Sequence, residues 1–268
     1  MIYKLDVELS PDLEPYRAKI EATIKPYIEI RLTDNNQPNW WQSKFGGLPY
    51  LPKGFTYPKS YDGEYLYLLA QINFVEVPHL EYFPNKGILQ FYIAADEELY
   101  GLNFDNPTQQ DKFRAVYFPD IDLKEDNLVT DFDFLPKLND EWLMPFEGCC
   151  SLDFTINFRP ITISDNKFSI FPVDEADANF QDIVDEYYDK FCMNKHKLGG
   201  YPNFVQYDPR YNYPQDEEPY ILLLQIDSDS SKSINICWGD GGIGNFFIKK
   251  SALERLDFSN VWYNWDCG

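Results

Sequence analysis

Two apolar runs are the clearest elements in the pattern of hydrophobic and polar positions. The first, YLYLLAQINF over residues 65–74, is too short for most helices and is bounded by turn residues. Such a run is typical of a strand covered on both faces. Gln71 lies in this run and Gln225 lies in the second, ILLLQI over 221–226, so each amide needs hydrogen-bond partners once buried. We expect these partners on the backbone of a neighbouring loop rather than on a ligand.

Three blocks of sequence recur in the same order. GGLP at 46–49 corresponds to GGYP at 199–202, at an offset of 153 (199 − 46). The two apolar runs follow at an offset of 154 (225 − 71), and a glycine-initiated strand pattern follows each run at 155 (242 − 87). Collinear blocks with such small drift predict an internal duplication.

Each double glycine is predicted to form a sharp corner of the chain. Glycine permits a positive φ and close backbone approach, and the proline two residues later fixes φ and stops any helix. The predicted structural corners are therefore Gly46, Gly47 and Pro49, and again Gly199, Gly200 and Pro202.

The parts between the repeated blocks contain helix and strand patterns. Apolar residues at helical spacing predict helices over 13–25 and 174–191, the first closed by a proline and followed by a strand over 27–32. Alternating apolar residues from 152 predict a strand that continues past Pro160 to 163. SALE at 251–254 has the spacing of a capping box at a helix start.

These patterns predict a mainly β fold of the β-rich α+β class. We expect a single domain over 1–268, built from two diverged, pseudo-symmetric β units, about 27–140 and 149–268, that share a core and carry a few flanking helices. The composition supports this class, because 18% aromatic residues and 19 prolines favour strands and turns over long helices. We place the boundary between the units near 140–148, and loops at 103–112 and 123–131.

The net charge of −21 limits the partners. Nucleic acids and anionic membranes are not expected, because binding them requires basic side chains. The acidity indicates either a solvated, self-repelling surface or a protein that steers towards a basic partner. No apolar run approaches the roughly 20 residues of a membrane-spanning helix, and the start lacks signal-peptide features, so we expect a cytoplasmic location.

Five cysteines, an odd number without CxxC spacing, are expected to be free thiols in a reducing compartment. We interpret Cys149-Cys150 as a loop-to-strand junction with buried sulfur rather than as metal ligands. The ordered calcium-loop pattern is also missing. We predict neither a metal nor a cofactor.

The segment HKLGGYPNFVQYDPR at 196–210 holds one of only two histidines. His196 is a candidate for acid–base chemistry, but it follows the predicted helix, where histidine commonly interacts with the last carbonyls, and we prefer this capping role. Asp208 and Arg210 flank a proline, which favours a local turn with an Asx-type hydrogen bond and an ion pair over a catalytic dyad.

A second glycine-rich segment is CWGDGGIG at 237–244. It lacks the phosphate-loop patterns and leads into a strand, so nucleotide binding is not expected. We predict a hairpin turn at Asp240 and the two glycines after it, with Trp238 capping the core. Catalysis by Cys237 with His196 would need spatial adjacency, and a cysteine in such a strand is more often buried and inert.

The chain resembles the YwqG-like family, a bacterial domain of unknown function. The resemblance covers nearly the whole chain from about residue 27 and rests on ordered segments, among them FGGLPYLPKGFTYP, LYLLAQINFVEVP, HKLGGYPNFVQYDPR, CWGDGGIGNFFIKKSAL and FSNVWYNWDCG. It implies a single mainly β protein with flanking helices and no assigned catalytic mechanism. It also implies an association with immunity proteins that neutralise bacterial toxins.

Two function classes follow, and we prefer binding over catalysis. The first is a cytoplasmic binding protein, such as an immunity protein for a basic toxin, whose acidity would speed the encounter. The second is an enzyme or small-ligand binder with a cleft between the two units. A plain scaffold or regulator is a third class. No catalytic residue or oligomeric state is assigned, and the candidate ligand-binding residues are His196, Gln206, Asp208, Arg210, Gln225, Trp238 and Asp240.

Overall fold

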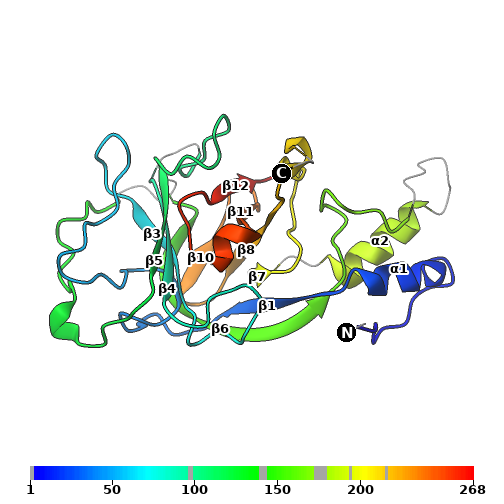
Figure 1. Cartoon of the computed structure of the whole chain (residues 1–268), viewed down its shortest axis with the longest axis horizontal. Coiled ribbons are helices and arrows are strands. Elements are labelled where there is room, and N and C mark those ends of the chain that lie inside the picture. Colours follow the sequence, from blue (N-terminus) through cyan, green and yellow to red (C-terminus); the bar gives the residue numbers. More distant parts are fainter. Residues whose placement is uncertain (1–2, 96–98, 139–143, 172–179, 193–194, 215–216) are drawn as a thin grey trace.

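The computed structural model describes residues 3–95, 99–138, 144–171, 180–192, 195–214 and 217–268. The molecule is elongated, with the strands gathered at one end and helices α1 and α2 at the other (Figure 1). It contains 31% strand and 13% helix, and the strands form a large and nearly closed antiparallel sheet. The predicted mainly β class is therefore confirmed. No helix in the described ranges is both long enough and apolar enough to cross a membrane.

Twelve strands of the described chain join in this sheet. In chain order they are β1 (Lys25–Leu32), β2 (Lys44–Gly46), β3 (Tyr67–Asn73), β4 (Ile88–Ile93), β5 (Phe113–Phe118), β6 (Phe146–Arg159), β7 (Lys197–Gly199), β8 (Tyr220–Asp227), β9 (Asp229–Ser230), β10 (Ile234–Ile236), β11 (Ile243–Lys249) and β12 (Trp262–Asp266).

The strands are arranged symmetrically about the centre of the sheet, where β1 pairs with β6. The path is β12-β11-β8-β7-β1-β6-β2-β3-β4-β5, with β10 and β9 attached to the start of β6. The strands that carry the repeated blocks, β2-β3-β4 and β7-β8-β11, therefore lie at mirrored places along the path. β2 pairs with β6 and β7 pairs with β1, so each segment places its short strand beside the long strand of the other. The two segments are interlocked, while their common descent stays a prediction.

Both double glycines form left-handed corners. Gly46 and Gly47 have φ of +67° and +71°, and Gly199 and Gly200 have +68° and +70°. A Cβ on Gly46 would lie 2.4 Å from the carbonyl oxygen of Gly148, closer than any side chain tolerates. Glycine is therefore required at each corner, both by the positive φ and by the lack of space for a Cβ atom.

A buried glutamine binds the backbone just after each corner. Gln71 Oε1 accepts a hydrogen bond from Tyr50 N at 2.8 Å, and Gln225 Oε1 accepts one from Asn203 N at 2.7 Å. Tyr50 and Asn203 hold the same place, four residues after the first glycine of each pair. The predicted loop-binding role of both glutamines is confirmed.

A second pair of amides binds the carbonyl groups of the same two residues. Gln90 Nε2 donates to Tyr50 O at 2.7 Å, and Asn245 Nδ2 donates to Asn203 O at 3.0 Å. Gln90 lies on β4 and Asn245 lies on β11, the third repeated block of each segment. Two neighbouring strands thus bind the N–H and the carbonyl of one residue after each corner.

One hydrophobic core joins both segments. The rings of Phe91 and Phe246, which occupy corresponding places on β4 and β11, have centroids 4.6 Å apart. Phe113 of β5 lies 5.3 Å from Tyr263 of β12, so side chains from opposite ends of the strand path meet. A smaller cluster packs α2 against α1 and the segment after β6.

The side chain of Gln110 links the two ends of the strand path. Its Nε2 donates to Phe258 O at 2.7 Å, and its Oε1 accepts from Ala115 N of β5 at 2.8 Å. The Gln110 amide thereby accepts a hydrogen bond from a backbone N–H of the edge strand β5 and links this strand to the loop before β12. This bond contributes to the nearly closed form of the sheet.

The first helix is shorter than the sequence predicts. The described helices are η1 (Glu14–Tyr16), α1 (Arg17–Ala22), η2 (Glu125–Asn127), α2 (Phe180–Phe191), η4 (Pro209–Asn212) and α3 (Lys250–Glu254). The apolar stripe of α2 is confirmed from Phe180 onward, while 174–179 lie outside the described residues. Of the boundary predicted near 140–148, residues 140–143 also lie outside them, and β6 begins at Phe146. The predicted helix over 13–25 ends at Ala22, because Lys25 and Pro26 already belong to β1.

Three local predictions are wrong. Ser251 does not cap α3, since Lys249 holds the N-cap place and Ser251 binds Glu218 through both its N–H and its hydroxyl. Residues 161–163 do not continue the strand, because β6 ends at Arg159. Cys149 and Cys150 lie inside β6 and not at its start, and all five cysteines are free thiols.

We expect Gln71→Ala and Gln225→Ala each to lower the free energy of unfolding by roughly 2–4 kcal/mol, because a buried backbone N–H loses its acceptor and neighbouring carbonyls lose a donor. The loss should be larger for Gln71, which also accepts from Gln90 Nε2 and donates to two carbonyls, whereas Gln225 donates to Lys195 O alone. Urea unfolding followed by tryptophan fluorescence measures them, with exposed Gln109→Ala as the control. Losses no larger than the control's would contradict this account.

Candidate functional site

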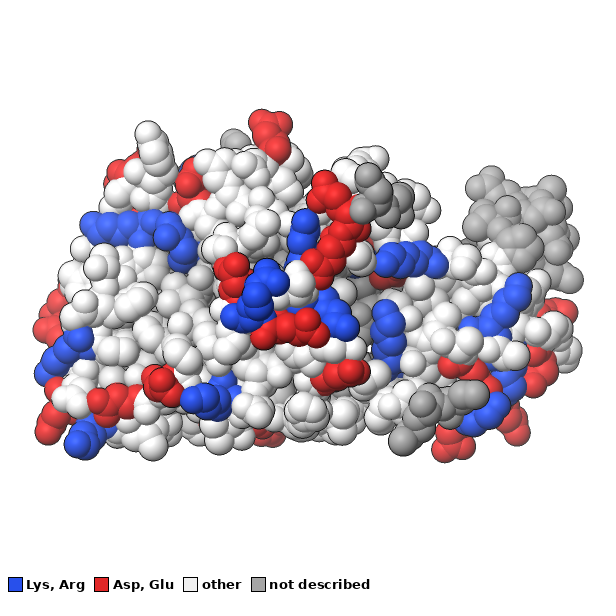
Figure 2. All heavy atoms as spheres, viewed as in Figure 1, with Lys and Arg blue, Asp and Glu red and all other residues white. Residues whose placement is uncertain are grey.

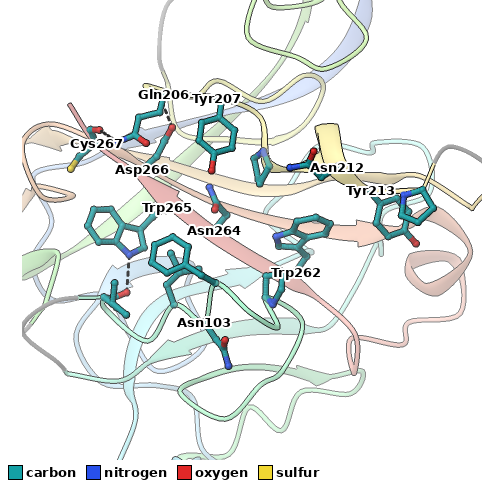
Figure 3. Close-up of a pocket in the computed structure, with 16 residues that line it drawn as sticks. Asn103, Gln206, Tyr207, Asn212, Tyr213, Trp262, Asn264, Trp265, Asp266 and Cys267 are labelled. Carbon is teal, nitrogen blue, oxygen red and sulfur yellow. Dashed lines mark hydrogen bonds between the residues drawn. The ribbon is translucent and has the colours of Figure 1, made fainter.

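A cleft of about 470 Å³ lies beside β12, between loops from both segments (Figure 3). One wall comes from the loop after β4, one from the segment that follows the second glycine corner, and the floor from β12 and the residue after it. The lining residues are Leu99, Leu102, Asn103, Phe104, Pro107, Gln206, Tyr207, Pro209, Asn212, Tyr213, Pro214, Trp262, Asn264, Trp265, Asp266 and Cys267. The C-terminal end of the chain lies near this strand (Figure 1).

Aromatic rings form both the floor and the exposed rim of the cleft. The Trp265 indole N–H donates to Leu99 O at 2.7 Å, which ties the floor to the opposite loop. Trp262 is buried and packs against Tyr220, with ring centroids 5.2 Å apart. On the rim, Phe104 is 72% exposed and Tyr207 is 65% exposed.

A buried ion network holds the Tyr207 loop from behind. Asp208 caps η4, and its Oδ1 accepts from both N and Nε of Arg210 at 2.9 Å. Arg210 Nη2 lies 2.6 Å from Asp208 Oδ2 and 3.0 Å from Asp165 Oδ2, and its guanidinium lies over the ring of Phe247. The predicted Asx-type turn and ion pair are confirmed, and their place in the core makes them supports for the cleft wall.

Asp266 anchors the same loop from β12. Its Oδ2 accepts from Val205 N at 3.0 Å and from Gln206 N at 2.7 Å. Its Oδ1 is buried and has no hydrogen-bond partner among the described residues. Burial raises the pKa of this carboxyl to about 6. The loop is therefore held by a carboxylate that is only half satisfied.

The structure separates the seven predicted ligand-binding residues. Gln206 lines the cleft and donates from Nε2 to Cys267 O, with Asp208 and Arg210 directly behind it. Gln225 is in the core at the glycine corner, His196 lies beside β8, and Asp240 is exposed in the turn after Trp238. Ligand binding by this set stays a prediction. Of its members, only Gln206, Asp208 and Arg210 lie together at the cleft wall.

His196 does not cap helix α2. Its Nδ1 accepts a hydrogen bond from Asp227 N at 3.0 Å, and its Nε2 lies 3.4 Å from Asp229 Oδ2. In the other segment, Ser43 Oγ accepts from Asn73 N at 2.9 Å, at the corresponding positions. His196 Nδ1 thus makes the structural hydrogen bond that Ser43 Oγ makes in the other segment. With its acceptor nitrogen occupied by a backbone N–H, the neutral ring has no lone pair left for a general base.

The Trp238 segment also differs from the expectation in part. Trp238 is fully buried in the shared core, as predicted. However, β10 pairs with β6 and β9 and not with β11, so the turn at Asp240 does not close a hairpin. Cys237 is exposed rather than buried, and its thiol points to Gly239 O at 3.2 Å.

Lys197 is a buried lysine with a strongly lowered pKa, and the sequence did not predict it as a site residue. Burial lowers its pKa to about 7, and its Nζ donates to Asn203 Oδ1. Lys44, at the corresponding place in the other segment, also has its pKa lowered, to about 8. The space next to Lys197 measures only about 20 Å³, which admits no substrate. This lysine is therefore part of the frame around the corner.

The sequence analysis missed most of the cleft residues, including Phe104, Tyr207, Asn264 and Trp265. One signal was present: Trp262, Asn264 and Asp266 alternate along WYNWD, which places them on one face of a strand. Their meeting with the loop after β4 depends on contacts across the whole chain, which no local pattern contains.

The side chains that line the cleft are mostly aromatic rings, prolines and amides. Among the described residues, Asp266 is the one carboxylate and Cys267 the one thiol, and no Lys, Arg or His lines the cleft. Paired carboxylates or a nucleophile beside a base are what acid–base or covalent catalysis requires. No group of three or more His, Cys, Asp or Glu side chains in the described part of the chain is arranged to hold a metal ion.

A family model described as Domain of unknown function (DUF1963) matches residues 43–267. The chain belongs to the DUF1963 family. The matched region of this DUF1963 protein begins just before the first glycine corner and ends within the cleft, so it contains both corners and all the lining residues. No curated protein matches the chain.

Asp266→Asn keeps an oxygen for the two loop N–H groups but cannot ionise. Because the folded-state pKa of about 6 lies above the ordinary value, the folded protein binds this proton more tightly than the unfolded chain does. The wild type therefore gains stability from Asp266 as the pH falls through 6. The free energy of unfolding of the wild type, minus that of D266N, should therefore increase as the pH is lowered from about 8 to about 5.

Urea unfolding of both proteins across this pH range measures the difference. The matched control is Asp240→Asn, which removes an exposed carboxylate. A difference between wild type and D266N that stays constant with pH would show that Asp266 is not desolvated in the folded protein.

Proposed function

We propose that this DUF1963 protein is a binding protein whose cleft receives a segment of a basic protein partner. The observation that supports the proposal best is the pair of exposed rings, Phe104 and Tyr207, on the rim of a cleft whose floor contains two tryptophans. Tyrosine and tryptophan dominate the central contacts of protein interfaces, because they bury a large area at a small entropic cost.

The amides of the cleft favour a peptide ligand. Asn212 and Asn264 make no side-chain hydrogen bond to any described residue, so their donors and acceptors are available to a partner. Pro107, Pro209 and Pro214 add rigid apolar surface between them. Aromatic and proline surface with interspersed amides is suited to an extended backbone, which needs both stacking and hydrogen bonds.

The net charge of −21 favours a basic partner. Acidic and basic side chains are interspersed on the face in Figure 2, so the attraction comes from the whole molecule rather than from one patch on that face. The YwqG-like resemblance adds the finer proposal that the protein acts in the cytoplasm as an immunity protein against a basic toxin, such as a nuclease.

A small-molecule ligand is the second candidate. The cleft volume of about 470 Å³ lies within the usual range for such sites, and its walls come from both segments. A small ligand enclosed by the cleft would bind without the salt dependence expected for an acidic protein and a basic partner.

The test begins with a partner captured from the native cell and then purified. Its complex with the full chain should weaken as salt is added, and Tyr207→Ala should weaken it by about tenfold or more. Tyr61→Ala is the matched control, because Tyr61 is 85% exposed and does not line the cleft. Binding that ignores both salt and Tyr207→Ala would refute the proposal.

A further inference from the structure

The charge inside the cleft is one-sided. Asp266 is the only charged residue among the described residues that line it, and no ion pair to Asp266 exists within the described chain. Behind the wall, Asp208 and Asp165 share the single guanidinium of Arg210, so this cluster offers no excess positive charge to the cleft. An anion placed in the cleft would meet this unpaired negative charge without any compensating cation.

Aromatic faces next to the carboxylate favour a cation. In Figure 3, Tyr207 from the loop and Asn264 from β12 project into the space between Trp265 and Trp262. The faces of such rings carry negative charge and attract a cation within about 6 Å of the ring centre. Lysine and arginine already use this contact elsewhere in the protein, where Arg210 lies 4.8 Å from the centre of the Phe247 ring.

We propose that the cleft binds the guanidinium group of an arginine side chain of the partner, stacked on the rim aromatics and donating to the amide oxygens. The inference rests on the proposed basic partner and names the residue type that the cleft selects. Guanidinium is planar and weakly hydrated, so it stacks and donates several hydrogen bonds at once, whereas an ammonium is compact and strongly hydrated.

A neutral occupant fits the same space less well. An apolar side chain would cover the free amides of Asn212 and Asn264 without bonding them, and would leave the charge of Asp266 buried further. Arginine supplies donors and positive charge together with a flat apolar face. Arginine is also among the residues that contribute most to protein interfaces.

The experiment uses the purified full chain and three synthetic peptides that differ at one residue: Ac-Gly-Gly-Arg-Gly-Gly-NH2, the same peptide with citrulline, and the same peptide with lysine. Citrulline has the shape of arginine without the charge. Calorimetry and the fluorescence of Trp262 and Trp265 measure binding. The arginine peptide should bind about tenfold more tightly than the citrulline peptide, and the lysine peptide should lie between them.

Two variants connect this preference to the cleft. Tyr207→Ala should weaken the arginine peptide by about tenfold, while Tyr61→Ala should leave it unchanged. Asp266→Asn should reduce the preference for arginine over citrulline, because it removes the charge and keeps the loop acceptor.

Equal binding of the arginine and citrulline peptides, no saturable binding of the arginine peptide, or arginine binding that survives Tyr207→Ala would overturn the inference. None of these results affects the proposed function if the purified partner complex still weakens on Tyr207→Ala. Loss of the partner's dependence on Tyr207, in contrast, would remove the proposed function itself.

Discussion

The fold depends on a buried amide that satisfies the backbone beyond a left-handed corner. Two consecutive glycines with positive φ turn the chain out of β2 and β7, and the peptides that follow would be buried without partners. Gln71 and Gln225 supply the acceptor, and Gln90 and Asn245 supply a donor from the next strand. Because an unpaired buried N–H or carbonyl costs as much as a lost hydrogen bond, these amides fix both the corner and the strand register.

The same frame determines where the cleft lies. After the second corner the chain passes Asn203 and runs directly into the loop that carries Tyr207. Asp266 binds this loop from β12, and the Asp208–Arg210 pair holds it from the core. Tyr207 therefore lies on a wall fixed at three places, the corner, Asp266 and the ion pair, which lowers the entropic cost of binding a partner.

The sequence predicted the features that depend on local chemistry. The glycine corners, the strands with buried glutamines and the stripe of α2 were all found from spacing and residue type. The capping box failed because Glu218, more than thirty positions away, binds Ser251. The hairpin at Asp240 failed because β10 pairs with β6 instead. The cleft depends in the same way on three segments distant in sequence, and local patterns do not contain such contacts.

The two segments keep the same hydrogen bonds but differ around them. Arg210 and Tyr57 correspond at an offset of 153 (210 − 57), and Phe247 and Tyr92 correspond at 155 (247 − 92). Arg210 lies over Phe247, whereas Tyr57 packs against Tyr92 with ring centroids 5.7 Å apart. In the first segment this place is therefore filled by aromatic packing, and in the second it supports the Asp208 turn below Tyr207. The ion pair that holds the rim has no counterpart at Tyr57, which instead lines a separate cleft of about 1100 Å³ next to the first glycine corner. The two segments therefore build their clefts with different side chains, an ion pair behind one and aromatic packing behind the other.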